Sequence, residues 1–345
     1  MSERAIDQAS AGAGSAGSSA AGHDETRPGR PPTAVGRLRV ILNRSAGSKI
    51  GVASSDPTPD DIRALLDQVG IEAEIVESGS IEETRAIARG AAEAGAPAIA
   101  VAGGDGTIGV VAVELLGSET ALGILPLGSV MNIPRMLGLP RDLPAAATIL
   151  ANGVVRAIDV GQVRGRPFFE TTSVGMNAAV FSAAARLEQG ERHSVFRTIW
   201  VALRYRPSRM RIELDDRAIR TRALTVTVSN GPYTGTGMTV APHARLDDGR
   251  LDVRVFERFS KVELVRHFAS IAFGRRAYEP RVSSFRSRRV RISSRHPQPV
   301  RADSHDVGTT PVELDVRPGA LRVVVAPDGL PDEAPVEVPT PGRAA

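Results

Sequence analysis

The stretch Val101–Thr107, which reads VAGGDGT, follows an apolar run and precedes an apolar, helix-like segment. A strand, a glycine-rich turn and a helix start in that order can bind phosphate, because backbone N–H groups and the positive helix end face an anion. Glycine also removes the Cβ that would hold the backbone away from phosphate oxygens. The carboxylate of Asp105 would repel a phosphate unless a cation, a ribose hydroxyl or a water lay between them. The stretch therefore predicts a nucleotide site or, on the glycines alone, an ordinary strand-to-helix turn.

Short apolar runs alternate with amphipathic segments on both sides of this stretch. Runs typical of strands lie at Leu38–Asn43, Ile71–Glu77, Ala98–Ala102 and Ala121–Leu125. Helical spacing of apolar residues is found at Asp60–Val69, Ile81–Ala94, Ile108–Leu116 and Asp142–Leu150. This alternation predicts a parallel sheet with helices on both faces, whose ligands bind beyond the carboxyl ends of the strands. Small-residue loops are expected there at 43–49, 103–107 and 126–132.

From Val154 onward the sequence changes to β-like runs separated by turn signals. These runs lie at Val155–Val160, Phe168–Ser173, Met210–Leu214, Ala223–Ser229, Leu251–Phe256, Val290–Ser293, Val312–Val316 and Leu321–Val325. Helical interruptions are expected near Ala178–Leu187, Ser194–Tyr205 and Lys261–Phe273. We therefore predict a mostly antiparallel, β-rich second domain.

The predicted domain organisation has four parts. Residues 1–36 and 327–345 are expected to be disordered tails, because they contain few apolar anchors and many small, proline or acidic residues. Residues 37–155 form the expected α/β, nucleotide-binding domain. Residues 156–326 form the β-rich second domain, whose last strands could pack back on the first domain.

The amino-acid composition excludes several classes of protein and of functional site. The 345 residues include no cysteine, which excludes disulfides, thiol catalysis and cysteine–zinc sites. No apolar run approaches the roughly 18 residues of a membrane span, and the N-terminal region lacks the layout of a signal peptide, so a cytoplasmic protein is expected. The net charge of +4 is due to arginine, since Lys49 and Lys261 are the only lysines. Aromatic residues make up 4% of the chain, too few for base stacking, and no nucleic-acid partner is expected.

Several motifs together resemble those of a known family. In the first half they are the loop Asn43–Gly47, the GGDGT sequence at 103–107 and the block at 126–140. In the second half they are the segments 173–180, 230–238, 241–242, 246–252, 300–305 and 317–321. Their order and spacing resemble the diacylglycerol kinase catalytic-domain superfamily, in its bacterial lipid-kinase branch, which is related to sphingosine and ceramide kinases. The resemblance extends from Leu38 to Ala326.

This resemblance implies a fold like that of NAD kinase and diacylglycerol kinase, and transfer of the γ-phosphate of ATP to a lipid alcohol such as diacylglycerol. It implies Mg²⁺ at the turn 246–251, with Asp248 and the carbonyls of Leu246 and Leu251 as ligands. Without the resemblance, an aspartate–glycine turn between strands is more commonly just a hairpin. Asp105 would contact a magnesium-bound water, and Asp303 would be the general base. The nucleotide would contact Asn43, Ser45, Gly47, Lys49, Gly103, Gly104, Asp105, Gly106, Thr107, Gly128, Ser129 and Asn132.

Four departures from the family pattern bear on activity. The glutamate of the family that follows the glycine loop is Val110 here, and the Asn-Asp pair of the third loop reads Met131-Asn132. In the second domain a Phe-Asp pair reads Met176-Asn177, and an Asp-Gly-Glu turn ends in His305. Two alternatives therefore remain open. One is a catalytically impaired member that binds nucleotide or lipid, and the other is a soluble-substrate kinase of the NAD-kinase type.

A lipid substrate implies contact with a membrane surface, here peripheral contact at the inner membrane. A set of apolar residues suits either an interfacial helix or a helix packed on the core: Val195, Phe196, Ile199, Trp200 and Leu203. A set of basic residues suits either attraction to anionic lipid or a solvated strand face: Arg286, Arg288, Arg289, Arg291 and Arg295. A homodimer is also left open.

Overall fold

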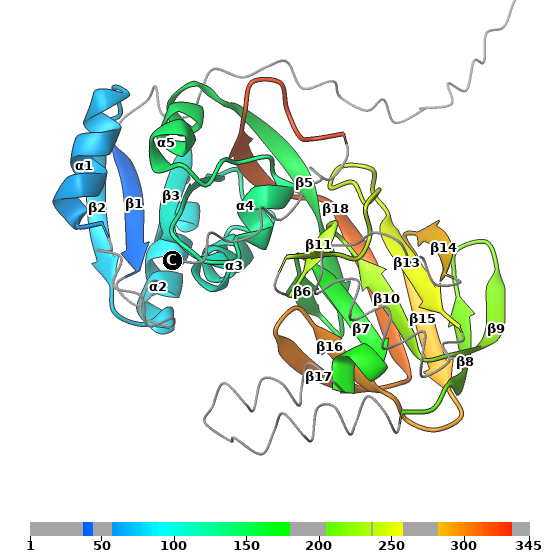
Figure 1. The fold of residues 1–345 in the computed structure, drawn as a ribbon. Helices are drawn as coiled ribbons and strands as arrows, with labels where there is room; N and C mark the ends of the chain where they lie inside the picture. Colours follow the sequence, from blue (N-terminus) through cyan, green and yellow to red (C-terminus); the bar gives the residue numbers. More distant parts are fainter. Residues whose placement is uncertain (1–36, 44–56, 180–204, 236, 258–281, 333–345) are drawn as a thin grey trace, which may run out of the picture.

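The computed structural model describes residues 37–43, 57–179, 205–235, 237–257 and 282–332 (Figure 1). It confirms the predicted fold class, because parallel strands with flanking helices in the first half are followed by mostly antiparallel strands. The expected N-terminal tail, residues 333–345 of the expected C-terminal tail and most of the three helical interruptions predicted in the second half lie outside the described residues. Residues 327–332, which we expected to be disordered, are described: Leu330 packs against the core of the first half, and Asp332 pairs with Arg245 at 3.1 Å. Among the described residues, no helix combines the length and apolar character needed to cross a bilayer.

The first half contains four parallel strands in the order β2 (Ala73–Ser78), β1 (Leu38–Asn43), β3 (Ala98–Gly103) and β4 (Ala121–Pro126). Alternate side chains of these strands enter two different cores. On β1, Ile41 packs with α2 (Ile81–Glu93), α3 (Asp105–Glu114) and α4 (Asn132–Met136). Its neighbours Val40 and Leu42 pack on the other face with α1 (Pro59–Gln68) and α5 (Leu143–Asn152). Both faces of the sheet are therefore buried, as predicted.

The strand β18 (Val312–Val325) joins the two halves of the molecule. Its last residues lie between β4 and β5 (Val154–Val163), and β4 runs parallel to it. Its first residues pair with β15 (Arg289–Ser294), which continues to β8 (Ser208–Glu213) and β9 (Ala218–Ala223). One sheet thus runs from the α/β half into the β-rich half, and β6 (Arg166–Phe168) pairs only with β5 in it.

A second sheet of six antiparallel strands packs against this extension. Its order is β14 (Val282–Ser287), β13 (Leu251–Phe256), β10 (Thr225–Ser229), β7 (Thr171–Gly175), β16 (Pro299–Ala302) and β17 (His305–Thr309). Valines of β7, β10 and β13 share one core with Met210, Ile212 and Ile292 of the first sheet. The second half is therefore a β-sandwich. The short pair β11 (Tyr233–Thr234) and β12 (Met238–Thr239) lies outside both sheets.

Some boundaries differ from those expected. The run Phe168–Ser173 is broken at Phe169 and Glu170, whose N–H groups bind a side chain instead of a neighbouring strand. The two runs at the end of the chain form the single strand β18, which has an irregularity between Arg317 and Leu321. The helix α3 begins at Asp105 rather than Ile108, so the last part of the glycine stretch forms its first turn.

Candidate functional site

Two of the predicted loops touch through their glycines. Gly104 is the N-cap of α3, and a Cβ added to Gly128 would lie 2.8 Å from the Cα of Gly104. The N–H of Leu127 also donates to the carbonyl of Gly103 at 3.0 Å. The backbones of the second and third loops therefore approach each other more closely than a side chain would allow. This close contact between the loops explains why glycines stand at these positions, in addition to any role in phosphate binding.

The first loop joins this arrangement through Asn43 at the end of β1. The Nδ2 atom of Asn43 donates to Oγ1 of Thr107 at 2.6 Å. Thr107 is buried in the first turn of α3, close to Gly103, where an added Cβ would lie 3.0 Å from the Cβ of Thr107. The predicted contacts Ser45, Gly47 and Lys49 lie outside the described residues.

Asp105 connects α3 to the start of α4. Its Oδ2 and Oδ1 atoms accept hydrogen bonds from the N–H groups of Asn132 and Ile133, each at 2.9 Å. The preceding residue, Met131, has a left-handed backbone with φ of 55°. Burial raises the pKa of the Asp105 carboxyl, and the N–H donors oppose that rise. Asp105 therefore caps α4 and fixes Asn132. Both of its oxygens already have a protein donor in the position where we expected a magnesium-bound water.

The side chain of Asn132 reaches from α4 to the second half of the chain. Its Nδ2 atom donates to Oε2 of Glu170 at 3.1 Å and to the carbonyl of Gly235 at 2.9 Å. Its Oδ1 atom is buried without a hydrogen-bond partner among the described residues. One turn later, Arg135 donates to the carbonyl of Gly237 at 3.3 Å and lies over the ring of Tyr233. The helix α4 therefore contacts the β-rich half through two polar side chains, Asn132 and Arg135.

Glu170 is a site residue that the sequence analysis missed. It lies between β6 and β7, and its carboxyl binds Asn132. Burial, followed by the negative charge of Asp303, raises the pKa of Glu170 to about 8, and Asp105 adds to that rise. The one available signal was a single acidic residue in the apolar and hydroxyl-bearing run FFETTS at Phe168–Ser173. A buried carboxyl of raised pKa in contact with polar groups of another domain is typical of a functional site.

Asp303 lies in the turn between β16 and β17, in a left-handed conformation with φ of 45°. Its Oδ2 atom accepts from the N–H of Phe169 at 2.9 Å, and Oδ1 accepts from those of Glu170 and Thr171 at 3.0 and 3.1 Å. Burial raises the pKa of Asp303, while these three donors and His305 oppose the rise. His305 is exposed and contacts Ser304.

Asp105, Asn132, Glu170 and Asp303 thus form one line of contacts from the α/β half to the β-rich half. Each member is joined to the next by a hydrogen bond that involves a backbone N–H or a side-chain amide. The carboxyls are close enough to influence one another, since Asp303 and Asp105 both affect the pKa of Glu170. We call this set the carboxyl line. Ser129 lies beside it in the third loop, where its carbonyl accepts from Arg141 at 3.1 Å.

The turn that contains Asp248 forms a second acidic region. Asp248 accepts from the N–H of Arg250 at 3.0 Å and lies 3.5 Å from a guanidinium nitrogen of Arg286. Its Oδ2 atom is buried without a hydrogen-bond partner among the described residues. Asp159 accepts from the N–H of Gly249 at 2.6 Å. Burial raises the pKa of Asp159 and of Asp252, and the charge of Asp248 contributes to both shifts.

This turn suits a hard cation held by one carboxylate and main-chain oxygens, because the buried Oδ2 atom of Asp248 accepts no hydrogen bond among the described residues, although it lies 3.5 Å from a guanidinium nitrogen of Arg286. In the described part of the chain, no group of three or more acidic, histidine or cysteine side chains is arranged around a metal position. The carbonyl of Leu246 already accepts the N–H of Asp159 at 2.6 Å, and Leu251 begins β13. Asn230 connects the two acidic regions, since its Nδ2 atom donates to the carbonyls of Asp159 and Phe169.

The basic residues expected to attract lipid lie on or next to two strands of different sheets, β14 and β15. Arg286 lies 3.6 Å from Asp252 in addition to Asp248, and Arg291 forms an ion pair with Glu313 at 3.3 Å. Arg295 lies apart from them, at the end of β15 next to β8. The apolar set 195–203 lies outside the described residues.

Two family models match the chain. The model of the diacylglycerol kinase catalytic domain matches residues 37–163. The model of the YegS C-terminal NAD kinase beta sandwich-like domain matches residues 170–325. Residues 164–169, which include β6, separate the two matches, and the second match begins at Glu170.

Proteins of similar sequence and structure agree with these models. A diacylglycerol kinase of Mycobacterium tuberculosis is 26% identical over 299 residues, which cover 84% of this chain and 95% of the relative. A probable lipid kinase YegS-like of Chromohalobacter salexigens is 29% identical over 251 residues, or 70% of this chain and 80% of the relative. The crystal structure of a diacylglycerol kinase from Bacillus anthracis superposes with a TM-score of 0.65 at 19% identity, covering 85% of this chain and 98% of that one.

Proposed function

Because the chain belongs to the diacylglycerol kinase catalytic-domain superfamily of lipid kinases, we propose that it transfers the γ-phosphate of ATP to the hydroxyl of diacylglycerol or a related lipid alcohol. The observation that carries this proposal is the carboxyl line. It links Asp105, at the glycine loop, to Asp303, in the β-rich half, through Asn132 and Glu170. We call the contact between the two halves along this line the seam. Phosphoryl transfer needs such a seam, with a nucleotide on one side and an acceptor hydroxyl on the other.

In this proposal ATP lies over the carboxyl ends of β1, β3 and β4. The N–H groups of the first turn of α3, at Gly106 and Thr107, face the phosphates together with the third loop at Gly128 and Ser129. Asn43, at the end of β1, donates to Thr107 in the first turn of α3. Ser45, Gly47 and Lys49 are assigned to the nucleotide on their sequence alone. Asp105 keeps the third loop in place, because it caps α4 with both oxygens.

The two linked carboxyls have different proposed roles in proton transfer. Burial raises the pKa of Asp303, and three N–H donors oppose that rise by stabilising the ionised carboxylate that a general base requires. Glu170 has a pKa of about 8 and is mostly protonated at neutral pH. We therefore assign Asp303 as the base that accepts the proton of the acceptor hydroxyl. Glu170 holds a proton beside it and limits the negative charge at the seam.

Magnesium is the metal that this function requires. Asp248 and main-chain oxygens of the turn 246–251 would hold one ion there. A bound Mg²⁺ would neutralise phosphate charge during transfer. The neighbouring carboxyls of Asp159 and Asp252 make this region more negative. This charge favours a bound cation in addition to the guanidinium of Arg286, which pairs with Asp248.

The test is transfer of radiolabelled γ-phosphate from ATP to diacylglycerol in mixed micelles. We expect Asp303→Asn to lower the rate by about 100-fold or more, the usual contribution of a general base. The matched control is Asp306→Asn, because Asp306 lies on the same hairpin and is exposed. An active enzyme that Asp303→Asn leaves unchanged would exclude Asp303 as the base.

One observation favours a second candidate, a nucleotide-binding member without transfer activity. The third loop carries Asn132 in place of the family's carboxylate, and both oxygens of Asp105 accept from α4. Binding of ATP without phosphorylation of any alcohol in a broad lipid panel would establish this candidate. Phosphorylation of NAD in the same assay would instead favour a soluble substrate.

A further inference from the structure

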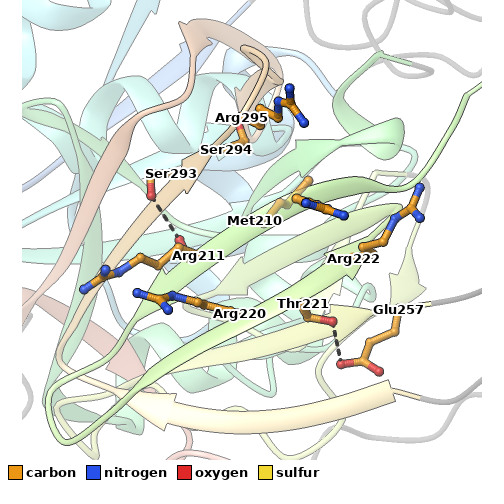
Figure 2. Close-up of a pocket in the computed structure, with 10 residues that line it drawn as sticks. Met210, Arg211, Arg220, Thr221, Arg222, Glu257, Ser293, Ser294 and Arg295 are labelled. Atoms are coloured by element: carbon orange, nitrogen blue, oxygen red, sulfur yellow. Dashed lines mark hydrogen bonds between the residues drawn. The ribbon is translucent and has the colours of Figure 1, made fainter.

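Basic side chains line a hollow of about 650 Å³ on the β-rich half, on β8, β9 and the end of β15 (Figure 2). We call it the arginine hollow, and its basic residues are Arg209, Arg211, Arg220, Arg222 and Arg295. All five side chains are exposed. None of them belongs to the carboxyl line or to the acidic turn at 246–251.

The strand register places like charges directly opposite each other in this hollow. On the pair β8–β9, Arg209 faces Arg222 and Arg211 faces Arg220. Like charges in such cross-strand positions are destabilising. An anion bound between the strands would reverse this effect, because it would lie close to guanidinium groups from both.

Carboxylates of the protein neutralise little of this charge. Arg211 forms an ion pair with Glu213 at 2.7 Å. Of the described residues that line the hollow, Glu257 is the acidic one, and its Oε1 accepts from the hydroxyl of Thr221 at 2.9 Å (Figure 2). With the residues that the structure describes, four arginine side chains form neither an ion pair nor a hydrogen bond: Arg209, Arg220, Arg222 and Arg295.

We propose that the arginine hollow binds the phosphate groups of anionic phospholipids at a bilayer surface. Guanidinium groups match phosphate oxygens with paired N–H donors, and several lie here on two adjacent strands. Among the described residues no aromatic side chain lines the hollow for base stacking, which disfavours single-stranded nucleic acid. The choice of a lipid source of phosphate rests on the proposed function, since an enzyme that phosphorylates a membrane lipid must meet a bilayer. The arginine hollow binds the phosphate groups of the bilayer surface, whereas the acceptor lipid binds at the seam.

The test is sedimentation of the full-length protein with phosphatidylglycerol vesicles and with phosphatidylcholine vesicles, at low salt and without ATP. The triple variant Arg209→Gln, Arg220→Gln and Arg222→Gln is compared with Arg63→Gln, Arg85→Gln and Arg89→Gln, which removes the same charge from α1 and α2. We expect the hollow variant to bind phosphatidylglycerol vesicles about 100-fold more weakly, at ~1 kcal/mol per arginine and ~1.4 kcal/mol per tenfold change. The α1–α2 variant should bind nearly as well as the wild type.

Equal loss of binding in both variants would overturn the proposal, because it would show attraction by net charge alone. Vesicle binding that neither variant weakens would also overturn it. Wild-type binding of inorganic pyrophosphate or an oligonucleotide, without binding of phosphatidylglycerol vesicles, would reject the lipid as the source of phosphate. The proposed function is tested separately, since transfer to diacylglycerol in detergent micelles needs no anionic bilayer and should survive the hollow substitutions.

Discussion

At the scale of single residues, Glu170 connects the charge state of the site to the stability of the protein. Its side chain contacts Asn132 across the seam, and its N–H donates to Asp303. Its pKa rises from 4.5 to about 8 on folding, mainly because of burial. A carboxyl whose pKa rises on folding stabilises the protein below its unfolded pKa, and this contribution is lost as the pH rises through the folded value.

Glu170→Gln should therefore stabilise the protein at high pH and not at low pH. The glutamine stays neutral at pH 9, where the wild-type carboxyl must ionise inside the seam. We expect the free energy of unfolding to rise relative to the wild type by at least about 1 kcal/mol between pH 5 and pH 9, since one unit of pKa shift corresponds to ~1.4 kcal/mol. Chemical denaturation at both pH values measures this difference.

Glu82→Gln corrects for the loss of one charge, because Glu82 is exposed in the first turn of α2. The free energies of unfolding of Glu170→Gln and the wild type could also differ by the same amount at pH 5 and at pH 9. That result would show that Glu170 does not titrate in this range.

At the scale of elements, the start of α4 depends on one carboxylate. Asp105 accepts with both oxygens, and asparagine has only one acceptor oxygen. We expect Asp105→Asn to lower the free energy of unfolding by about 1–3 kcal/mol, the cost of a lost buried hydrogen bond to a charged group. Asp142→Asn is the control, because Asp142 caps α5 through one oxygen and asparagine caps a helix equally well. Equal effects in urea denaturation would contradict the assigned role of Asp105.

The contact between the second and third loops gives another prediction at this scale. Gly128→Ala would place a Cβ 2.8 Å from the Cα of Gly104, so the loops must separate. We expect loss of ATP binding, measured by calorimetry, and a lower unfolding temperature. In Gly109→Ala the new Cβ meets nothing within 4 Å in the middle of α3, and this control should gain about 0.5–1 kcal/mol of stability with ATP binding unchanged. Retained ATP binding in Gly128→Ala would show that the close approach is not needed.

Local patterns predicted some elements well and others poorly. The strands β3 and β4 are continuous apolar runs, and the bounds of β1 agree with those expected. The strands β9, β14 and β17 were missed, because most of their side chains are polar or exposed. The break at Phe169 and Glu170 could not be predicted, because it depends on Asp303, more than 130 residues later in the chain.

At the scale of the whole molecule, β18 fixes how the two halves meet. It pairs with β5 along most of its length, with β4 near its last residues and with β15 near its first (Figure 1). The seam that contains the carboxyl line therefore has a continuous sheet beside it. The motifs identified the two sides of the seam, at Asp105 and at Asp303. They did not identify Glu170, whose importance comes from the approach of α4 to the break between β6 and β7.

The central claim is that Glu170 and Asp303 act as one unit in phosphoryl transfer across this seam. A double-mutant cycle tests it most directly, with the rate of γ-phosphate transfer from ATP to diacylglycerol measured for the wild type, Glu170→Gln, Asp303→Asn and the double variant. Residues that act as a unit give strongly non-additive effects, so we expect the double variant to be hardly slower than Asp303→Asn alone. Rate losses that multiply independently, or no transfer to any lipid alcohol by the wild type, would contradict this account.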